Sequence, residues 1–380
     1  MLGIVSLLMD VSSEMINSLL PLYLATGLGA STLAIGAIEG LSVAIATLSK
    51  FLSGMLSDVS GRAKLLAVLG YGLGALSRLI FPWAVSLDQI VLAKAMDRVG
   101  KGIRGAPRDA IVAAVSPPEI RGASFGLRKS LDTVGGFVGP LLAVGAMFLL
   151  AGDIPSVFLL AAVPAALCMI VLVVFVKEPP GQHAIKRARF RLGDAFGLNR
   201  AVWAVIALAA VIMLARFSEA FVLLKALEAG IAPAWVPLSL VVMHAAYGLT
   251  AYPVGRLSDR IGTRGLLLVS LVFLAAAHLV LAQAAGAWVY VAGTVFWGLH
   301  MGFSQDLLGA MIAGATPDHL KGSAFGTFNL VTGLVVLIGN ILAGWLWQVS
   351  GSAAPFLVGA ALSVLAMLVI ALWPRAGRAS

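Results

Sequence analysis

Charged side chains are scarce in this sequence of 380 residues, since Asp, Glu, Lys and Arg together make up only 11% of it. Soluble domains carry about 25% charged residues, so these few charges cannot cover a surface that faces water. The chain is also 60% hydrophobic, with a mean hydropathy of +1.01. These values exclude a soluble globular protein and predict an integral membrane protein in contact with the lipid bilayer.

Cysteine is almost absent as well. Cys168 stands alone in an apolar run, which excludes a disulfide framework and a cysteine metal cluster. The sequence has no Walker-type glycine-rich loop for nucleotide phosphates, and its histidines and methionines lack the spacing of a metal site. We therefore expect no metal, no cofactor and no ATP hydrolysis. No nucleophile–base set emerges either, so an enzyme is not expected.

Twelve segments have the length and apolar character of a membrane-spanning helix, which needs about 20 residues. Six precede and six follow a polar stretch at residues 177–200, where Pro179 and Pro180 break the helix before a basic cluster. We expect an all-α fold of two six-helix bundles, residues 1–176 and 201–380, joined by a basic cytoplasmic linker. The predicted spans are 2–25, 32–56, 65–84, 87–108, 122–150, 155–176, 201–226, 235–254, 265–284, 287–314, 323–348 and 354–373.

Basic residues are missing from every second loop between these spans. Those loops contain Asp88, Asp153 and Glu228, whereas the alternate loops and the linker hold Lys and Arg. Because short cytoplasmic loops are enriched in Lys and Arg, both termini are predicted on the cytoplasmic side of an inner (plasma) membrane. These loops explain the formal net charge of +9, and no nucleic-acid partner is expected.

The chain contains an internal repeat. "GMLSDVSGRAK" (54–64) matches "GRLSDRIGTRG" (255–265), and "SPPEIRGASFG" (116–126) matches "TPDHLKGSAFG" (316–326), at nearly the same offset. Internal repeats of this kind underlie many transporter folds. The two bundles are therefore predicted to be pseudo-symmetric copies of one six-helix unit.

The repeated turn is also the signature by which the sequence resembles the major facilitator superfamily. The family motif G-x-x-x-D-x-x-G-R fits residues 54–62, and "RVGKG" (98–102) resembles its span-4 motif. "GGFVGPLLAVG" (135–145) partly resembles the span-5 motif of exporters that exchange substrate for protons. The resemblance implies alternating access, in which two bundles rock around a central cavity.

The resemblance further implies residues that open and close the cavity. Asp58 can accept hydrogen bonds from a helix N-terminus or pair with an arginine of span 4, and the glycines permit tight turns. The alternative is that these loops only set the topology. The predicted gating residues are Gly54, Asp58, Gly61, Arg62, Arg104, Arg108, Gly139, Pro140, Gly255, Asp259 and Gly262.

Two acidic residues lie inside the first predicted span. Asp10 and Glu14 are four residues apart, hence on one helical face, and Asn17 extends that face. Ionisable groups within a membrane are costly and mark functional sites, and neighbouring carboxylates bind protons as a coupled pair. We predict that Asp10, Glu14 and Arg98 provide proton coupling. The alternative is a permanent ion pair between one acid and a basic residue of span 4.

Span 4 ends in the charged stretch "DRVGKGIRGAPRDA" (97–110). The charged side of this helix cannot face lipid, so its inner part is expected to line the cavity and its outer part to form a cytoplasmic gate. The aligned stretch of the second half, "WGLHMGFSQDLLGA" (297–310), has lost nearly all of these charges, so charge movement is expected in the first half. The residues predicted at membrane depth are Lys94, Asp97, Arg98 and Lys101.

Other polar residues on apolar spans complete the predicted cavity. Arg216 and Glu219 are three residues apart and are as compatible with an internal pair as with substrate contact. A lone histidine is more often a packing residue than a proton carrier. These further residues are Asn17, Glu39, Arg78, Asp132, Arg216, Glu219, His244 and His300.

The sequence thus predicts a proton-coupled secondary transporter that moves a small organic molecule, acts as a monomer and favours export. Uptake of an organic anion is the main alternative, because the cavity has a positive balance, while the acids of span 1 suit a cationic substrate. A transporter-like receptor or assembly factor that moves nothing is the alternative of another class.

Overall fold

The computed structural model describes residues 1–60, 63–178, 197–304, 307–317 and 320–372, and within these ranges the chain is helical apart from short connections. The first part of the chain forms α1 (Leu2–Asn17), α2 (Leu20–Leu22), the π-turn η1 (Tyr23–Gly27), α3 (Thr32–Ser60), α4 (Ala63–Ile80), η2 (Phe81–Trp83), α5 (Leu87–Val115), η3 (Pro118–Ile120), α6 (Arg121–Leu149), α7 (Ile154–Leu160) and α8 (Ala162–Phe175). The second part forms α9 (Arg200–Ala215), α10 (Glu219–Glu228), η5 (Pro233–Trp235), α11 (Leu238–Ala282), α12 (Ala287–Ser304), α13 (Leu307–Ala315), α14 (Lys321–Ser350) and α15 (Ala353–Leu372).

Nine helical segments of the described chain are long and apolar enough to cross a membrane. Three predicted spans, 87–108, 235–254 and 287–314, are not among them. The first coincides with α5, whose charges lower its mean hydropathy, and the third begins in α12, which contains two tryptophans and His300. The middle one falls in α11, where several side chains lie outside the described residues. A charged helix can still occupy membrane depth when other helices cover it.

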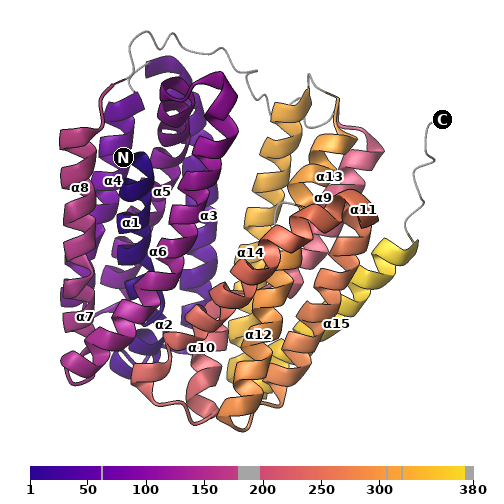
Figure 1. Cartoon of the computed structure of the whole chain (residues 1–380). Coiled ribbons are helices and arrows are strands. Elements are labelled where there is room, and N and C mark those ends of the chain that lie inside the picture. The colour runs from indigo at the N-terminus through magenta and orange to yellow at the C-terminus, as the bar shows by residue number, and fades with distance from the viewer. Residues whose placement is uncertain (61–62, 179–196, 305–306, 318–319, 373–380) are drawn as a thin grey trace.

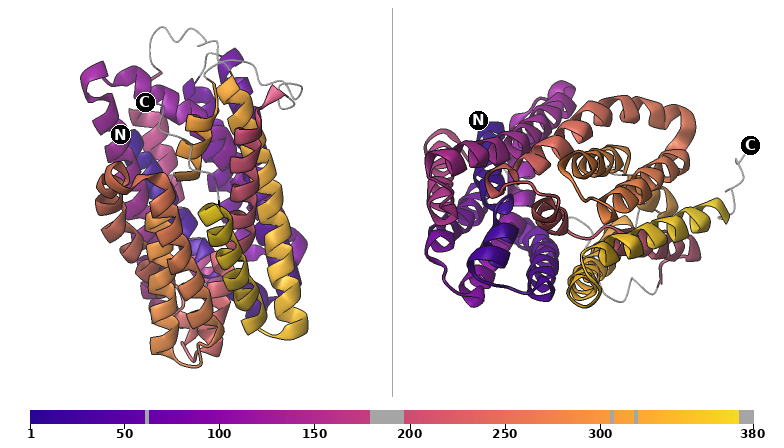
Figure 2. Two further views of the ribbon diagram at one scale, coloured as in Figure 1. Left: turned by 90° about the vertical axis from the view of Figure 1, so that its right-hand side faces the viewer. Right: turned by 90° about the horizontal axis from the view of Figure 1, so that it is seen from below.

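The helices form two groups in space. α1 to α8 lie on the left of Figure 1 and most of α9 to α15 on the right, with α10 at the lower centre beside α2; the view from below in Figure 2 shows the same division. α3 and α14 meet where the groups touch, since the hydroxyl of Thr32 donates a hydrogen bond of 3.0 Å to the carbonyl oxygen of Gly344.

Two helices of the second group are interrupted. Arg216 leaves helical geometry (φ −93°, ψ 80°), and Ser218 then caps α10 with a hydroxyl that accepts a hydrogen bond from the backbone N–H of Ala220. Within α11, Gly262 has φ 70° and ψ 164°, a left-handed value that glycine adopts without steric cost. Gly262, predicted in the repeated turn, therefore separates α11 into two helical segments.

Glycine contacts set the distance between α4 and α5. A methyl group on Gly100 would lie 2.9 Å from the backbone nitrogen of Gly74, and one on Gly70 would lie 2.7 Å from the backbone nitrogen of Arg104. The two backbones therefore touch, which brings the charges of α5 against α4. Small residues allow this approach in membrane helices.

The substitution Gly100→Ala should lower the melting temperature of the purified protein, because the added methyl forces α4 and α5 apart; overpacking costs about 1–3 kcal/mol. Gly105→Ala, on the same helix, is the matched control because nothing lies within 4 Å of the added atom. Equal melting temperatures for the two variants in a thermal unfolding assay would show that the contact is not tight.

Candidate functional site

The buried charges of α5 are met by charges on other helices. Asp97 is 5% exposed and lies 2.7 Å from Nη1 of Arg78 on α4, which is 1% exposed. Its other oxygen lies 3.5 Å from Nε of Arg98. Lys94 forms an ion pair with Glu39 on α3. Each buried ion thus has a partner of opposite sign, as burial requires.

Two serines of α1 complete the environment of Arg78. The guanidinium donates hydrogen bonds to Ser12 (3.2 Å) and Ser13 (2.7 Å). Ser12 in turn donates to the carbonyl oxygen of Ala161, at the start of α8. Arg78 therefore connects α1, α4, α5 and α8 through polar contacts that lipid cannot provide.

Glu39 links the two groups of helices. One carboxylate oxygen binds Lys94, and the other accepts a hydrogen bond of 3.3 Å from the hydroxyl of Ser218, at the break between α9 and α10. The backbone N–H of Ser218 donates a hydrogen bond of 2.7 Å to the side-chain oxygen of Asn340 on α14. This contact lies beside a small cavity of about 260 Å³ that Arg216 and Glu219 also line.

The two acids of α1 have different partners. Asp10 lies 3.9 Å from the guanidinium of Arg104, which stacks 4.6 Å from the ring centre of Tyr71. Glu14 accepts a hydrogen bond of 3.2 Å from the amide of Asn17 and has no basic group within 4 Å in the described part of the chain. Asp10 thus has an ion-pair partner on α5, whereas Glu14 lines the cavity without one among the described residues.

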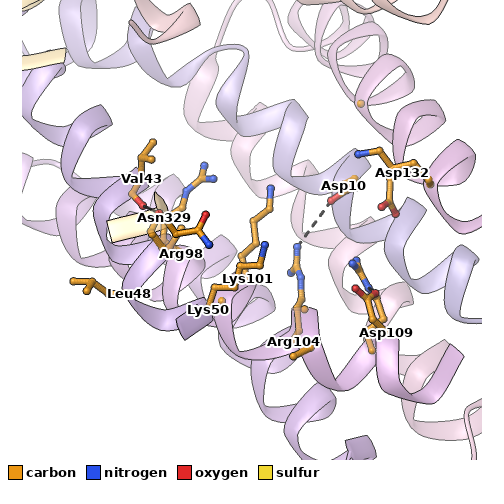
Figure 3. Close-up of a pocket in the computed structure, with 18 of the residues that line it drawn as sticks. Asp10, Val43, Leu48, Lys50, Arg98, Lys101, Arg104, Asp109, Asp132 and Asn329 are labelled. Atoms are coloured by element: carbon orange, nitrogen blue, oxygen red, sulfur yellow. Dashed lines mark hydrogen bonds and ion pairs between the residues drawn. The ribbon is translucent and has the colours of Figure 1, made fainter. Parts of the chain in front are cut away.

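A cavity of about 1440 Å³ lies between the two groups of helices and contains both acids (Figure 3). Among the described residues, its charged lining side chains come from the first part of the chain, and the second part contributes uncharged or histidine side chains. The charged ones are Asp10, Glu14, Lys50, Arg98, Lys101, Arg104, Arg108, Asp109, Lys129 and Asp132. The lining residues of the second part include His244, Tyr247, Met301, Phe325 and Asn329.

The cavity lies toward one end of the molecule. It is lined by the middle of α3, around Leu48, by the first half of α6, around Lys129, and by the first turns of α14, from Gly322 onward. At the other end, Gly36 on α3 lies against the backbone of Asn340, and the rings of Phe148 and Trp235 pack 5.0 Å apart. The cavity is therefore reached from the end that holds Lys64 and Lys321, which we call the basic end, and is closed at the opposite end.

Several predicted cavity residues are placed elsewhere by the structure. Arg78, Lys94 and Asp97 are buried in ion pairs, so they support the cavity wall without lining it. His300 is fully buried between α11 and α12, where its Nδ1 lies 2.9 Å from the carbonyl oxygen of Ser270. His244 does line the cavity. Its Nδ1 donates a hydrogen bond to the carbonyl oxygen of Leu240, and its Nε2 lies beside Gly136.

The predicted gating residues have varied positions. Arg104, expected near the cytoplasmic face, lies buried against Asp10, because its guanidinium folds back onto Tyr71. Arg108 donates to Ser6 and Asp109 at the cavity mouth. Gly139 packs against Glu14 and the backbone of α1, and Pro140 lies buried in α6. Gly61 and Arg62, and the side chains at positions 54, 58, 255 and 259, lie outside the described residues.

Some lining residues were not expected from the sequence. Lys50 belongs to a predicted span and so carried the same signal, an ionisable group at membrane depth, that identified the other charges. Lys129 lies in the third turn of α6, inside the predicted span 122–150, and so carried this signal as well. Asn329 and Ser218 carry no charge, and nothing in their local sequence distinguishes them.

Comparisons with known proteins find similarity to one family along nearly the whole chain. The family model of the Major Facilitator Superfamily matches residues 2–245 and 223–379. An uncharacterized MFS-type transporter of Methanocaldococcus jannaschii is 30% identical over 97% of this chain and 93% of its own. The class B tetracycline resistance protein of Escherichia coli is 30% identical over 36% of this chain and 34% of its own. The crystal structure of a point mutant of the nucleoside transporter NupG superposes with a TM-score of 0.82 at 16% identity, covering 97% of this chain and 98% of that one.

Asp97→Asn should destabilise the protein strongly, because it leaves the buried guanidinium of Arg78 without a counter-charge; breaking a buried pair costs about 3–5 kcal/mol. Asp109→Asn makes the same chemical change at a half-exposed carboxylate and should have a small effect. Both variants would be compared by thermal unfolding in detergent. A loss of stability as large in Asp109→Asn would contradict the special role of the buried pair.

Proposed function

The chain belongs to the major facilitator superfamily of transporters, and we propose that it is a proton-coupled secondary transporter that moves a small organic molecule across the inner (plasma) membrane. The observation that carries this proposal is the cavity between the two groups of helices, with the acids of α1 in its wall. We further propose that residues 1–176 and 201–380 form two six-helix halves, with twelve spans in all and both termini in the cytoplasm. The protein works as a monomer, because the cavity is complete within one chain.

Alternating access is supported by the difference between the two ends of the cavity. The space is lined by solvent-accessible side chains at the basic end and is closed by α3 and α14 at the other. This arrangement corresponds to a state open to the cytoplasm. In the opposite state the contacts of Gly36 and Gly344 separate, and the repeated turns at 54–62 and 255–262 close the basic end.

Proton coupling is supported by the open position of Glu14. Its side chain lines the cavity, lies one helical turn from Asp10, and has no ion-pair partner within 4 Å among the described residues. A carboxylate that is not held by a permanent ion pair can bind and release a proton during the cycle. Asp10, paired with Arg104, shares this role through its charge.

The direction of transport has two candidates. Export is supported by the span-5 sequence at 135–145 and by the partial similarity to the tetracycline resistance protein. Uptake of an organic anion together with protons is supported by basic cavity residues that have no acidic partner in the described chain.

A cysteine placed at Asn329 should react with a membrane-impermeant maleimide from the cytoplasmic side, because this residue lines the cavity at its open end. A cysteine at Asp88, exposed at the other end, should react only from outside. The one native cysteine, Cys168, is fully buried and should give little background. Labelling of both positions from the same side would overturn the proposed orientation.

Glu14→Gln should abolish proton-driven accumulation of substrate while leaving substrate exchange intact, because exchange requires alternating access but no net proton movement. Proton movement would be followed with a pH-sensitive dye in proteoliposomes, and exchange with labelled substrate. Asp153→Asn, at the closed end, is the matched control. Wild-type proton flux in the double variant Asp10→Asn/Glu14→Gln would remove α1 from the coupling mechanism.

A further inference from the structure

Three basic side chains gather on one wall of the large cavity. Arg98 and Lys101 lie one turn apart on α5, and Gly102 packs against the backbone of Ser49 and Lys50 on α3. This contact places Lys50 beside Lys101, and Figure 3 shows both lysines with Arg98 on the side of the cavity where Asn329 lies. We call Lys50, Arg98 and Lys101 the basic wall.

The two lysines of the basic wall have no ion-pair partner within 4 Å in the part of the chain that the structure describes. The other side of the cavity differs. There Asp10 lies near Arg104, and Asp109 and Asp132 both contact Arg128. Three acids of the cavity, Asp10, Asp109 and Asp132, are therefore paired with arginines. The positive charges of Lys50 and Lys101 are not balanced by a nearby carboxylate among the described residues.

Like charges that face one another in a membrane protein are unfavourable unless a counter-ion joins them. Water in the cavity reduces this cost, but it supplies no fixed negative charge. Nε of Arg98 is buried 3.5 Å from the carboxylate of Asp97, and Nη2 donates a long hydrogen bond of 3.3 Å to the side-chain oxygen of Asn17. The wall thus presents several charged donors toward the same space.

We propose that the basic wall binds the anionic group of the substrate, so that the transported molecule is an organic anion carrying carboxylate or phosphate. This inference rests on the proposed transport function. Lysine ammonium groups bind such anions as point charges, and charge-assisted hydrogen bonds are the stronger ones. Two free lysines fit a group with up to two negative charges.

The opposite wall suits the rest of such a molecule. Met301 and Phe325 provide apolar contacts, and Asn329 offers an amide next to the basic wall. His244 presents Nε2, because its Nδ1 is occupied by Leu240. A cavity with one charged wall and one mixed apolar wall is typical of sites that fix a ligand by a few polar groups and enclose it with apolar ones.

Anion binding also explains how a proton could accompany the substrate. The charged and titratable groups around Glu14 are Asp10 on α1, Arg98, Lys101 and Arg104 on α5, Asp132 on α6 and His244 on α11. An ionised Glu14 and a bound anion compete for the same cations. The anion therefore binds best when Glu14 carries a proton. Proton and anion then cross the membrane together, in the same direction.

The test measures anion binding to the purified full-length protein by its rise in melting temperature. The probes are succinate, citrate and glycerol phosphate, with succinamide and glycerol as neutral counterparts, at constant ionic strength. The anions should stabilise the wild type and the neutral compounds should not. Lys101→Gln and Lys50→Gln should each raise the dissociation constant of the anion about tenfold or more. Lys101→Arg keeps the positive charge and should retain most of the binding.

Lys129→Gln is the matched control, because it removes the same charge from the same cavity on the side of the acids. It should change affinity by less than about threefold, as expected for a distant, solvent-exposed charge. An equal loss in Lys129→Gln and Lys101→Gln would show a diffuse potential and would overturn the basic wall as a site. Failure of all three anions to bind would overturn it as well.

Flux measurements separate this inference from the transport function. An anion that binds through Lys101 but does not cross proteoliposome membranes would uphold the site and contradict transport. Proton-driven movement of an uncharged or cationic molecule, without anion binding, would uphold transport and contradict the site.

Discussion

The first group of helices depends on the neutralisation of Arg78. A guanidinium that is 1% exposed at membrane depth requires a carboxylate and several hydrogen-bond acceptors, and these come from Asp97, Ser12 and Ser13 on two other helices. Any rotation of α1, α4 or α5 would break one of these contacts. Because these contacts fix the rotation of α5, Arg98 and Lys101 face the cavity. Lys94 and Asp97 lie on the buried side of the helix and form its ion pairs. The close glycine contacts between α4 and α5 make this geometry possible.

The functional cavity has two dissimilar walls. Charges, including the acids of α1 and the basic wall, come from helices of the first group, and the second group supplies His244, Asn329 and apolar side chains. Glu39 and Ser218 connect the groups at the inner end of the cavity. A relative movement of the two groups would change both the access of water to Glu14 and the hydrogen bond between Glu39 and Ser218. If Glu14 binds the coupling proton as proposed, its protonation and the opening of the cavity depend on the same movement.

The positions of the helices follow largely from the sequence, because long apolar segments and turn residues determine them. The charges at membrane depth were also identifiable, since their cost makes each one conspicuous. Their partners were not. Asp97 and Lys94 were expected to line the cavity, yet Asp97 pairs with Arg78 on α4 and Lys94 pairs with Glu39 on α3. Such pairings depend on how each helix is rotated about its axis, which hydrophobic length does not specify. For the same reason His300 was expected in the cavity, although it is buried between α11 and α12. Lys50 was missed although it is an ionisable residue inside a predicted span.

The break between α9 and α10 has a consequence for how the two groups of helices can change over evolution. Ser218 reaches Glu39 through a hydroxyl at a helix cap, so the connection to the charged machinery passes through one short polar segment. Among the described residues, the ion pairs of the cavity wall lie within the first group of helices. Mutations on α11 and α14 can therefore reshape the cavity without disturbing the buried charges. Substitutions in the second group can therefore change which molecule fits the cavity while the buried ion pairs of the first group stay the same.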